Sequence, residues 1–237
     1  MNVFELDPST EYIKIHGLQR SGTNYVSHLI NENFENTKVL VNTGGWKHGF
    51  YMAPWVLGKE VHVVVVVKNP YAWLVSVYDY WTTRRLNVGP DLRGVPFTDF
   101  VRNRIYFEKQ RDVPYLFRAS NPVQHWNDMC FHWTSILFNE KKLYVVEYNS
   151  LLGNKNYLLE DIGKHLGIKL KDQKVDCDNI ILPSDEEIHV GDKKWDKKEY
   201  YTKEKYLELF DQSTLDFVNQ QLDLDLMIAF GYEYKGV

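Results

Sequence analysis

The stretch from Gly17 to Asn24 has the residue types of a loop that binds phosphate. It is Gly-Leu-Gln-Arg-Ser-Gly-Thr-Asn, with two glycines separated by four residues. In such a loop the backbone N–H groups, together with the start of the helix that follows, hold anionic oxygens. Arg20 adds a positive charge two residues before the second glycine. The pattern therefore predicts an anion-binding turn between a strand and a helix.

The loop differs from that of nucleotide triphosphatases directly after its second glycine. Those enzymes have lysine and then serine or threonine there, whereas this chain has Thr23 and Asn24. They also need a carboxylate for Mg²⁺, commonly at the end of a buried strand. Here the apolar run 61–67 ends in Lys68 instead. The sequence thus favours a phosphorylated ligand that is handled without a metal ion, and it predicts no metal site.

A second cationic position follows the apolar run. Lys68 is followed by Asn69 and then by Pro70, a residue that suits the first turn of a helix. Ser76 falls about two turns into that helix, on a face that can turn back toward the end of the strand. We predict that the ammonium group of Lys68 and the hydroxyl of Ser76 bind one phosphate together.

The elements that must position these residues alternate between strand and helix. We expect strands at 12–16, 38–41, 61–67 and 142–146, and helices at 23–34, from Pro70 onward, at 121–138, at 157–166 and at 214–230. The continuous run 61–67 is typical of a parallel strand that is buried on both faces. The polar segment 171–203 is expected to be a long surface loop.

This alternation predicts one α/β domain over residues 1–237. Its central, mostly parallel sheet should be flanked by helices, with the ligand beyond the carboxyl ends of the strands. A chain of 237 residues, of which 44% are hydrophobic, can bury a full core. The first ten residues do not resemble a secretory signal, so we expect the mature chain to begin there.

Composition also narrows the possible partners. The net charge of −4 argues against a protein that binds nucleic acid over a wide surface. No apolar run approaches the roughly 20 residues that cross a bilayer. The two cysteines, Cys130 and Cys177, suit a reducing compartment. We therefore expect a cytoplasmic protein with no nucleic-acid partner and no membrane partner.

At this point the motifs resemble those of the sulfotransferases that use 3′-phosphoadenosine 5′-phosphosulfate (PAPS) as donor. In that family a K/R-S-G-T-T-W-like turn binds the 5′-phosphosulfate, and residues 20–25 are similar to it. A buried strand that ends in R-N/D-P, with a serine eight residues after the arginine, binds the 3′-phosphate. Lys68, Asn69, Pro70 and Ser76 match that spacing, with lysine in place of arginine. The turn residues that the resemblance assigns to the donor are Arg20, Ser21, Gly22, Thr23, Asn24 and Tyr25.

Two later segments extend the resemblance, which covers roughly residues 12–230. Residues 145–152 are similar to a family strand that ends in V-x-Y-E-D-L-L, and by this resemblance Tyr148 and Tyr25 frame the adenine. Residues 191–198 are similar to a loop near the C-terminus that contacts phosphate, which implies roles for Lys193 and Lys194. The resemblance implies a P-loop NTPase-like sulfotransferase fold, with PAPS as donor and 3′,5′-adenosine bisphosphate (PAP) as product.

Sulfuryl transfer to a hydroxyl or amine requires a base near the proton of the acceptor. His48 is the candidate, because it follows the segment 38–41 through a glycine turn and should lie at the same sheet edge as the phosphate loop. Lys47 is a candidate to stabilise the sulfuryl oxygens, and Arg20 to stabilise charge on the leaving phosphate. The alternatives are a histidine that only bonds a backbone carbonyl and a plain surface lysine.

The sequence thus predicts a sulfotransferase that acts on a hydroxyl or amine of a small-molecule or carbohydrate acceptor. A P-loop kinase-like phosphotransferase is one alternative, although the lysine that it needs after Gly22 is missing. A non-catalytic nucleotide-binding relative is the other, and the lysine at position 68 keeps it open. The segment 82–120 has eight basic and four acidic residues. It is either a solvated face or a wall that attracts a polar or anionic acceptor.

Overall fold

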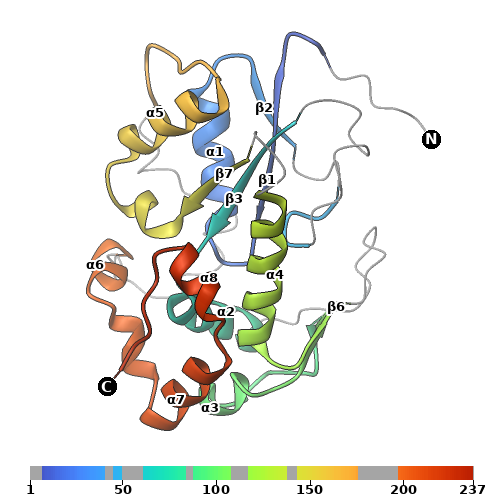
Figure 1. The fold of residues 1–237 in the computed structure, drawn as a ribbon, viewed down its shortest axis with the longest axis vertical. Helices are drawn as coiled ribbons and strands as arrows, with labels where there is room; N and C mark the ends of the chain where they lie inside the picture. The colour runs from blue at the N-terminus through green and yellow to red at the C-terminus, as the bar shows by residue number, and fades with distance from the viewer. Residues whose placement is uncertain are drawn as a thin grey trace, which may run out of the picture.

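A four-stranded parallel sheet forms the centre of the protein (Figure 1). The structure is a computed structural model, and it describes residues 7–40, 45–49, 61–83, 88–107, 117–137, 143–175 and 197–236. The strands are β1 (Glu11–Gly17), β2 (Thr37–Leu40), β3 (His62–Val67) and β7 (Leu143–Glu147), in the order β2-β1-β3-β7. Every pairing among them is parallel. The α/β class and the parallel sheet predicted from the alternating pattern are confirmed.

Strand β3 is buried along its whole length, because helices cover both faces of the sheet. On one face Val64 and Val66 pack in a core with α1 (Thr23–Asn33) and α5 (Lys155–Leu166). On the other face Val63, Val65 and Val67 pack in a larger core with α2 (Pro70–Thr83) and α4 (Pro122–Leu137). Figure 1 shows α1 and α5 on one side of the strands and α4 on the other. This burial on both faces explains why the strand is a run of valines rather than an alternating pattern.

A second, antiparallel sheet was not predicted from the sequence. It contains β4 (Val88–Gly89), β5 (Ile105–Phe107) and β6 (Phe117–Ala119), with α3 (Phe97–Phe100) between the first two strands. Strands of two or three residues are too short to show a period of two in the sequence. The 3-10 helix η2 (Tyr148–Leu152) that follows β7 was not predicted either, because five residues are too few to show a helical period.

Two predictions for the C-terminal third are wrong. The segment 171–203 is not a loop throughout, because it contains α6 (Lys197–Thr202), which the 3-10 helix η4 (Lys205–Leu209) follows. The helix expected at 214–230 is divided into α7 (Gln212–Gln221) and α8 (Leu224–Ala229). The division occurs at Asp223, whose side chain caps α8 by accepting from Leu226 N at 3.1 Å. Among the described residues, no helix is both long and apolar enough to span a bilayer.

Candidate functional site

The turn between β1 and α1 has the backbone conformation of an anion-binding loop. Arg20 and Gly22 have φ values of 66° and 92°, in the left-handed region. Gly22 is the N-cap of α1. Because glycine has no side chain, no capping side chain competes for the N–H groups of the first helical turn. Ser21 is buried and donates its hydroxyl to Leu18 O at 2.7 Å, which holds the turn from inside.

Both glycines of the loop are required by their surroundings. A Cβ atom at Gly17 would lie 2.7 Å from Ser21 Oγ, from Thr23 Cγ2 and from Val66 O, a backbone atom of the neighbouring strand. A Cβ atom at Gly22 would lie 3.1 Å from the ring of Tyr148. The loop is therefore closely packed at its start, and Tyr148 of η2 covers its second glycine. This arrangement explains the glycine spacing found in the sequence.

Lys68 and Ser76 are brought together as their spacing predicted. Lys68 follows β3 and is only 2% exposed, and its Nζ donates to Ser76 Oγ at 2.7 Å. The Nζ atom also lies 4.4 Å from the centre of the Tyr148 ring, in a cation–π contact. Trp126 fixes the backbone here by donating its indole N–H to Lys68 O at 3.0 Å. Since Tyr148 also packs on Gly22, one tyrosine connects the phosphate loop with the second cationic position.

Tyr201 of α6 belongs to the same group of side chains. Its hydroxyl accepts a hydrogen bond from Lys68 Nζ at 2.8 Å, and the centre of its ring lies 4.2 Å from the same nitrogen. Burial raises the pKa of Tyr201, while its contact with Ser76 and the nearby charge of Arg20 oppose that rise. Arg20 and Lys68 therefore both act on one tyrosine. No motif or spacing pointed to Tyr201, because it is 133 residues from Lys68 in a segment expected to be a loop.

His48 is held at the start of the phosphate loop. Its Nδ1 lies 2.7 Å from Gly17 O, while Gly17 N donates to Lys47 O at 3.1 Å. A carbonyl oxygen only accepts, so Nδ1 carries the proton and Nε2 carries the lone pair of the neutral ring. Burial is the main cause that lowers the pKa of His48 to about 3, and the charges of Lys47 and Lys14 add to it. The structure thus provides a neutral imidazole beside the loop.

Lys47 lies beside the phosphate loop as well. Its Nζ contacts Asn24 Oδ1, in the first turn of α1. Burial lowers the pKa of Lys47. Lys14, fully buried on β1, donates its Nζ to Gly45 O at 2.8 Å, and burial with the nearby Lys47 lowers its pKa to about 8. The segment 45–49 is therefore attached to β1 and to the loop, which places His48 and Lys47 on the same side of the site.

The similarity of this chain to known proteins is in structure rather than in sequence. No family model matches the chain, and no curated protein matches its sequence. Among solved structures, the chain is similar to the mouse sulfotransferase SULT7A1 complexed with PAP, with 16% sequence identity and a TM-score of 0.44. The match covers 71% of this chain and 61% of the mouse protein's chain, so it spans about three fifths of that protein's length.

The remaining predicted residues occupy different surroundings. Thr23 is buried, with its methyl group against Gly17. Tyr25 is half-buried on the side of the sheet that carries α1 and α5, with Lys155 Nζ 5.6 Å from the centre of its ring. The roles of Tyr25 and Tyr148 at the adenine stay predictions. Lys193 and Lys194 lie outside the described residues.

His125 gives a testable link between pH and stability. It is 4% exposed on α4, where it contacts the rings of Trp73, Trp81 and Phe107. Burial, followed by the nearby His48, lowers the pKa of His125 to about 3. The unfolded chain, in which the pKa is about 6.5, binds this proton more tightly, so stability falls as the pH decreases from about 6.5 toward 3. Between pH 7 and pH 5 this effect costs about 2 kcal/mol of unfolding free energy.

Urea unfolding of the wild type and of His125→Phe at both pH values measures the effect. The phenylalanine variant should lose about 2 kcal/mol less than the wild type over this interval. An equal loss in both proteins would show that His125 titrates normally in the folded state.

Proposed function

We propose that this protein is a sulfotransferase that moves the sulfuryl group of PAPS to a hydroxyl or amine of a small-molecule or carbohydrate acceptor. The observation that supports this most is the presence of two cationic side chains, Arg20 and Lys68, that both act on Tyr201. Arg20 belongs to the phosphate loop, and Lys68 is paired with Ser76 at 2.7 Å. A nucleotide with phosphates at both its 5′ and 3′ positions has anionic groups that match both centres. A nucleoside triphosphate carries all its phosphates at the 5′ position of the ribose, so it matches only one of the two centres.

The residues present fit such a donor. In the proposed complex, Arg20 and the N–H groups at the start of α1 bind the 5′ end, and Lys68 with Ser76 binds the 3′-phosphate. Gly17 lets the loop pack against Val66, and Gly22 supplies the left-handed backbone conformation at the start of α1. Tyr148 packs on Gly22 and over Lys68, so it lies between the two phosphate positions. PAPS would supply a sulfuryl group that is already activated by its bond to phosphate.

In the proposed reaction, His48 Nε2 accepts the proton of the acceptor. The acceptor oxygen or nitrogen then forms its bond to sulfur as the bond from sulfur to the phosphate oxygen breaks. Arg20 and the backbone N–H groups of the loop stabilise the negative charge that collects on the leaving phosphate. Lys47, beside Asn24, stabilises the sulfuryl oxygens during transfer. The proton remains on His48 until solvent removes it.

The low pKa of His48 is compatible with its proposed role as the base. A pKa of about 3 describes the protein without ligand, where the charges of Lys47 and Lys14 add to the effect of burial. An anionic donor bound beside Lys47 counteracts these positive charges and raises the pKa of His48. The imidazole becomes a stronger base once the donor is in place.

The donor class is tested by thermal unfolding in the presence of nucleotides. PAP at 100 times its dissociation constant should stabilise the protein by about 2.7 kcal/mol, which raises the midpoint of unfolding measurably. ATP with Mg²⁺ at the same concentration should raise it less, because a triphosphate does not reach both cationic centres. A larger shift with ATP and Mg²⁺ would instead support a kinase-like phosphotransferase.

A further inference from the structure

Three polar atoms form a closed triangle at the carboxyl end of β3. Lys68 Nζ lies 2.7 Å from Ser76 Oγ and 2.8 Å from the Tyr201 hydroxyl, and the two hydroxyl oxygens are 3.1 Å apart. Lys68 is 2% exposed and Tyr201 is 7% exposed. The triangle joins β3, α2 and α6. A tyrosine from the C-terminal part of the chain thus lies directly against the proposed phosphate-binding pair.

The direction of each hydrogen bond follows from counting protons. Ser76 has one hydroxyl proton, which it donates to Ala72 O at 3.0 Å. Ser76 Oγ therefore accepts from Lys68, and in its contact with Tyr201 the tyrosine is the donor. The Tyr201 oxygen in turn accepts from Lys68, which can only donate. Burial raises the pKa of Tyr201, so its hydroxyl remains protonated and neutral at pH 7. Toward Lys68, this hydroxyl has the role that a phosphate oxygen would have.

We infer that the Tyr201 hydroxyl is a placeholder that the 3′-phosphate of the nucleotide must displace. This inference rests on the proposed function, which assigns that phosphate to Lys68. On displacement, Lys68 exchanges a neutral oxygen acceptor for a charged one, and Ser76 turns its proton from Ala72 O to the phosphate. A nucleotide without a 3′-phosphate offers no acceptor for this exchange. Tyr201 therefore lowers the affinity for nucleotides that carry a 3′-phosphate and leaves the affinity for nucleotides without one unchanged.

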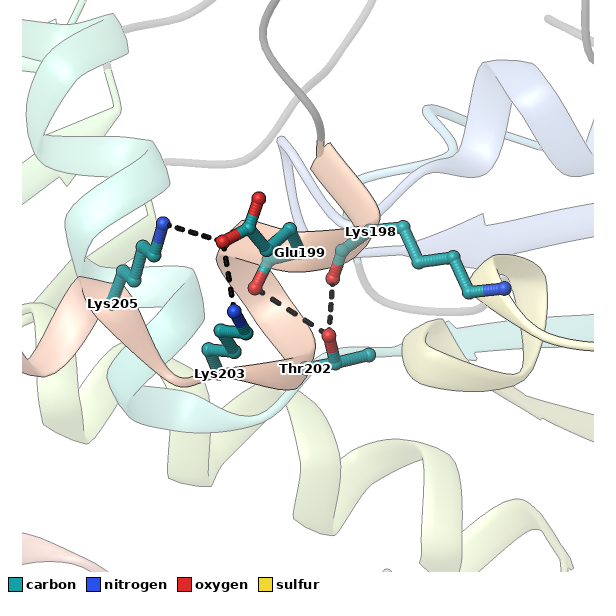
Figure 2. Close-up of polar contacts among 5 residues, drawn as sticks. All are labelled: Lys198, Glu199, Thr202, Lys203 and Lys205. Atoms are coloured by element: carbon teal, nitrogen blue, oxygen red, sulfur yellow. Dashed lines mark hydrogen bonds and ion pairs between the residues drawn. The ribbon is translucent and has the colours of Figure 1, made fainter.

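The anchoring of α6 is compatible with displacement. The helix has six residues. Glu199 accepts from Lys203 and Lys205 at 3.0 Å each, as Figure 2 shows together with the bonds from Thr202 Oγ1 to the carbonyls of Lys198 and Glu199. Ion pairs between exposed side chains contribute little to stability and are screened by salt. A charged ligand thus competes with a neutral hydroxyl, while the ring of Tyr201 stays packed in the core.

The test uses Tyr201→Phe, which keeps the ring and removes the hydroxyl. Calorimetric titration of the full chain with PAP should show an affinity about tenfold higher than that of the wild type, because a hydrogen bond to a charged group no longer competes. Titration with 5′-AMP, which lacks the 3′-phosphate, should show no change. Tyr200→Phe is the matched control, because it removes a hydroxyl from the same helix, and it should leave both affinities unchanged. Tyr201→Ala, which removes the ring as well, should also bind PAP more tightly than the wild type.

The opposite results overturn the inference. Weaker binding of PAP to Tyr201→Phe would show that the hydroxyl is a ligand of the phosphate rather than its competitor. An unchanged affinity, or an equal gain for 5′-AMP, would show that Tyr201 does not compete with the 3′-phosphate. If neither the wild type nor the variants bind PAP, the proposed function is itself wrong and the inference fails with it. Thermal unfolding of each variant confirms that it is folded.

Discussion

Replacement of His48 by alanine is expected to lower the kcat of sulfuryl transfer by about 10²- to 10⁴-fold, the usual contribution of a positioned base. The reason is the fixed proton of the ring: Nδ1 is bound to Gly17 O at 2.7 Å, so Nε2 is the atom that can accept a proton. The affinity for PAP should stay close to that of the wild type, because the imidazole is neutral and contacts the loop backbone. Single-turnover rates with PAPS, together with PAP titrations, measure both quantities.

The chain offers a matched control for this experiment. His165 also bonds a backbone carbonyl through a ring nitrogen, to Leu143 O at 2.9 Å, but at the opposite end of strand β7. His165→Ala should therefore leave kcat unchanged. An unchanged kcat in His48→Ala would remove His48 from the reaction. An equal fall in both variants would point to a loss of stability rather than of a base.

Lys68→Met is expected to weaken PAP binding by about 100-fold. The substitution keeps most of the volume of the side chain but removes the ammonium group, which donates to Ser76 and Tyr201. A hydrogen bond to a charged group contributes about 1.5–3 kcal/mol, and the upper part of that range corresponds to the predicted change in affinity. The affinity for 5′-AMP should be unaffected, because that nucleotide has no 3′-phosphate to place at this position.

Arg20→Met provides the complementary measurement. Arg20 belongs to the loop that is proposed to hold the 5′ end, so this variant should weaken the binding of both PAP and 5′-AMP. Lys169→Met is the neutral control, since Lys169 is an exposed partner of Glu35 at the surface. If Lys68→Met weakens 5′-AMP as much as PAP, the two centres do not bind opposite ends of one nucleotide. The proposed donor would then have no structural support.

Several features of the site were determined by the sequence alone. The two glycines at positions 17 and 22 predicted the loop because position 17 has room only for a hydrogen atom and position 22 has a left-handed backbone conformation. The interval from Lys68 to Ser76 predicted their contact because both lie on one continuous strand–turn–helix unit, in which local geometry fixes the distance. The valine run predicted a strand buried on both faces. The Lys68–Ser76 contact joins residues that are close in the chain. The glycines and the valines are set by the properties of single residues, which the sequence states directly.

Other features were decided only by the tertiary structure. Tyr201 reaches Lys68 from 133 residues away, on a helix that was expected to be a loop. The proton on Nδ1 of His48 is set by the carbonyl of Gly17, 31 residues distant. Asp223 ended a helix that the apolar pattern continued, because its side chain caps the next helix. Such contacts depend on how separate elements pack, and local pattern and spacing carry no information about that packing.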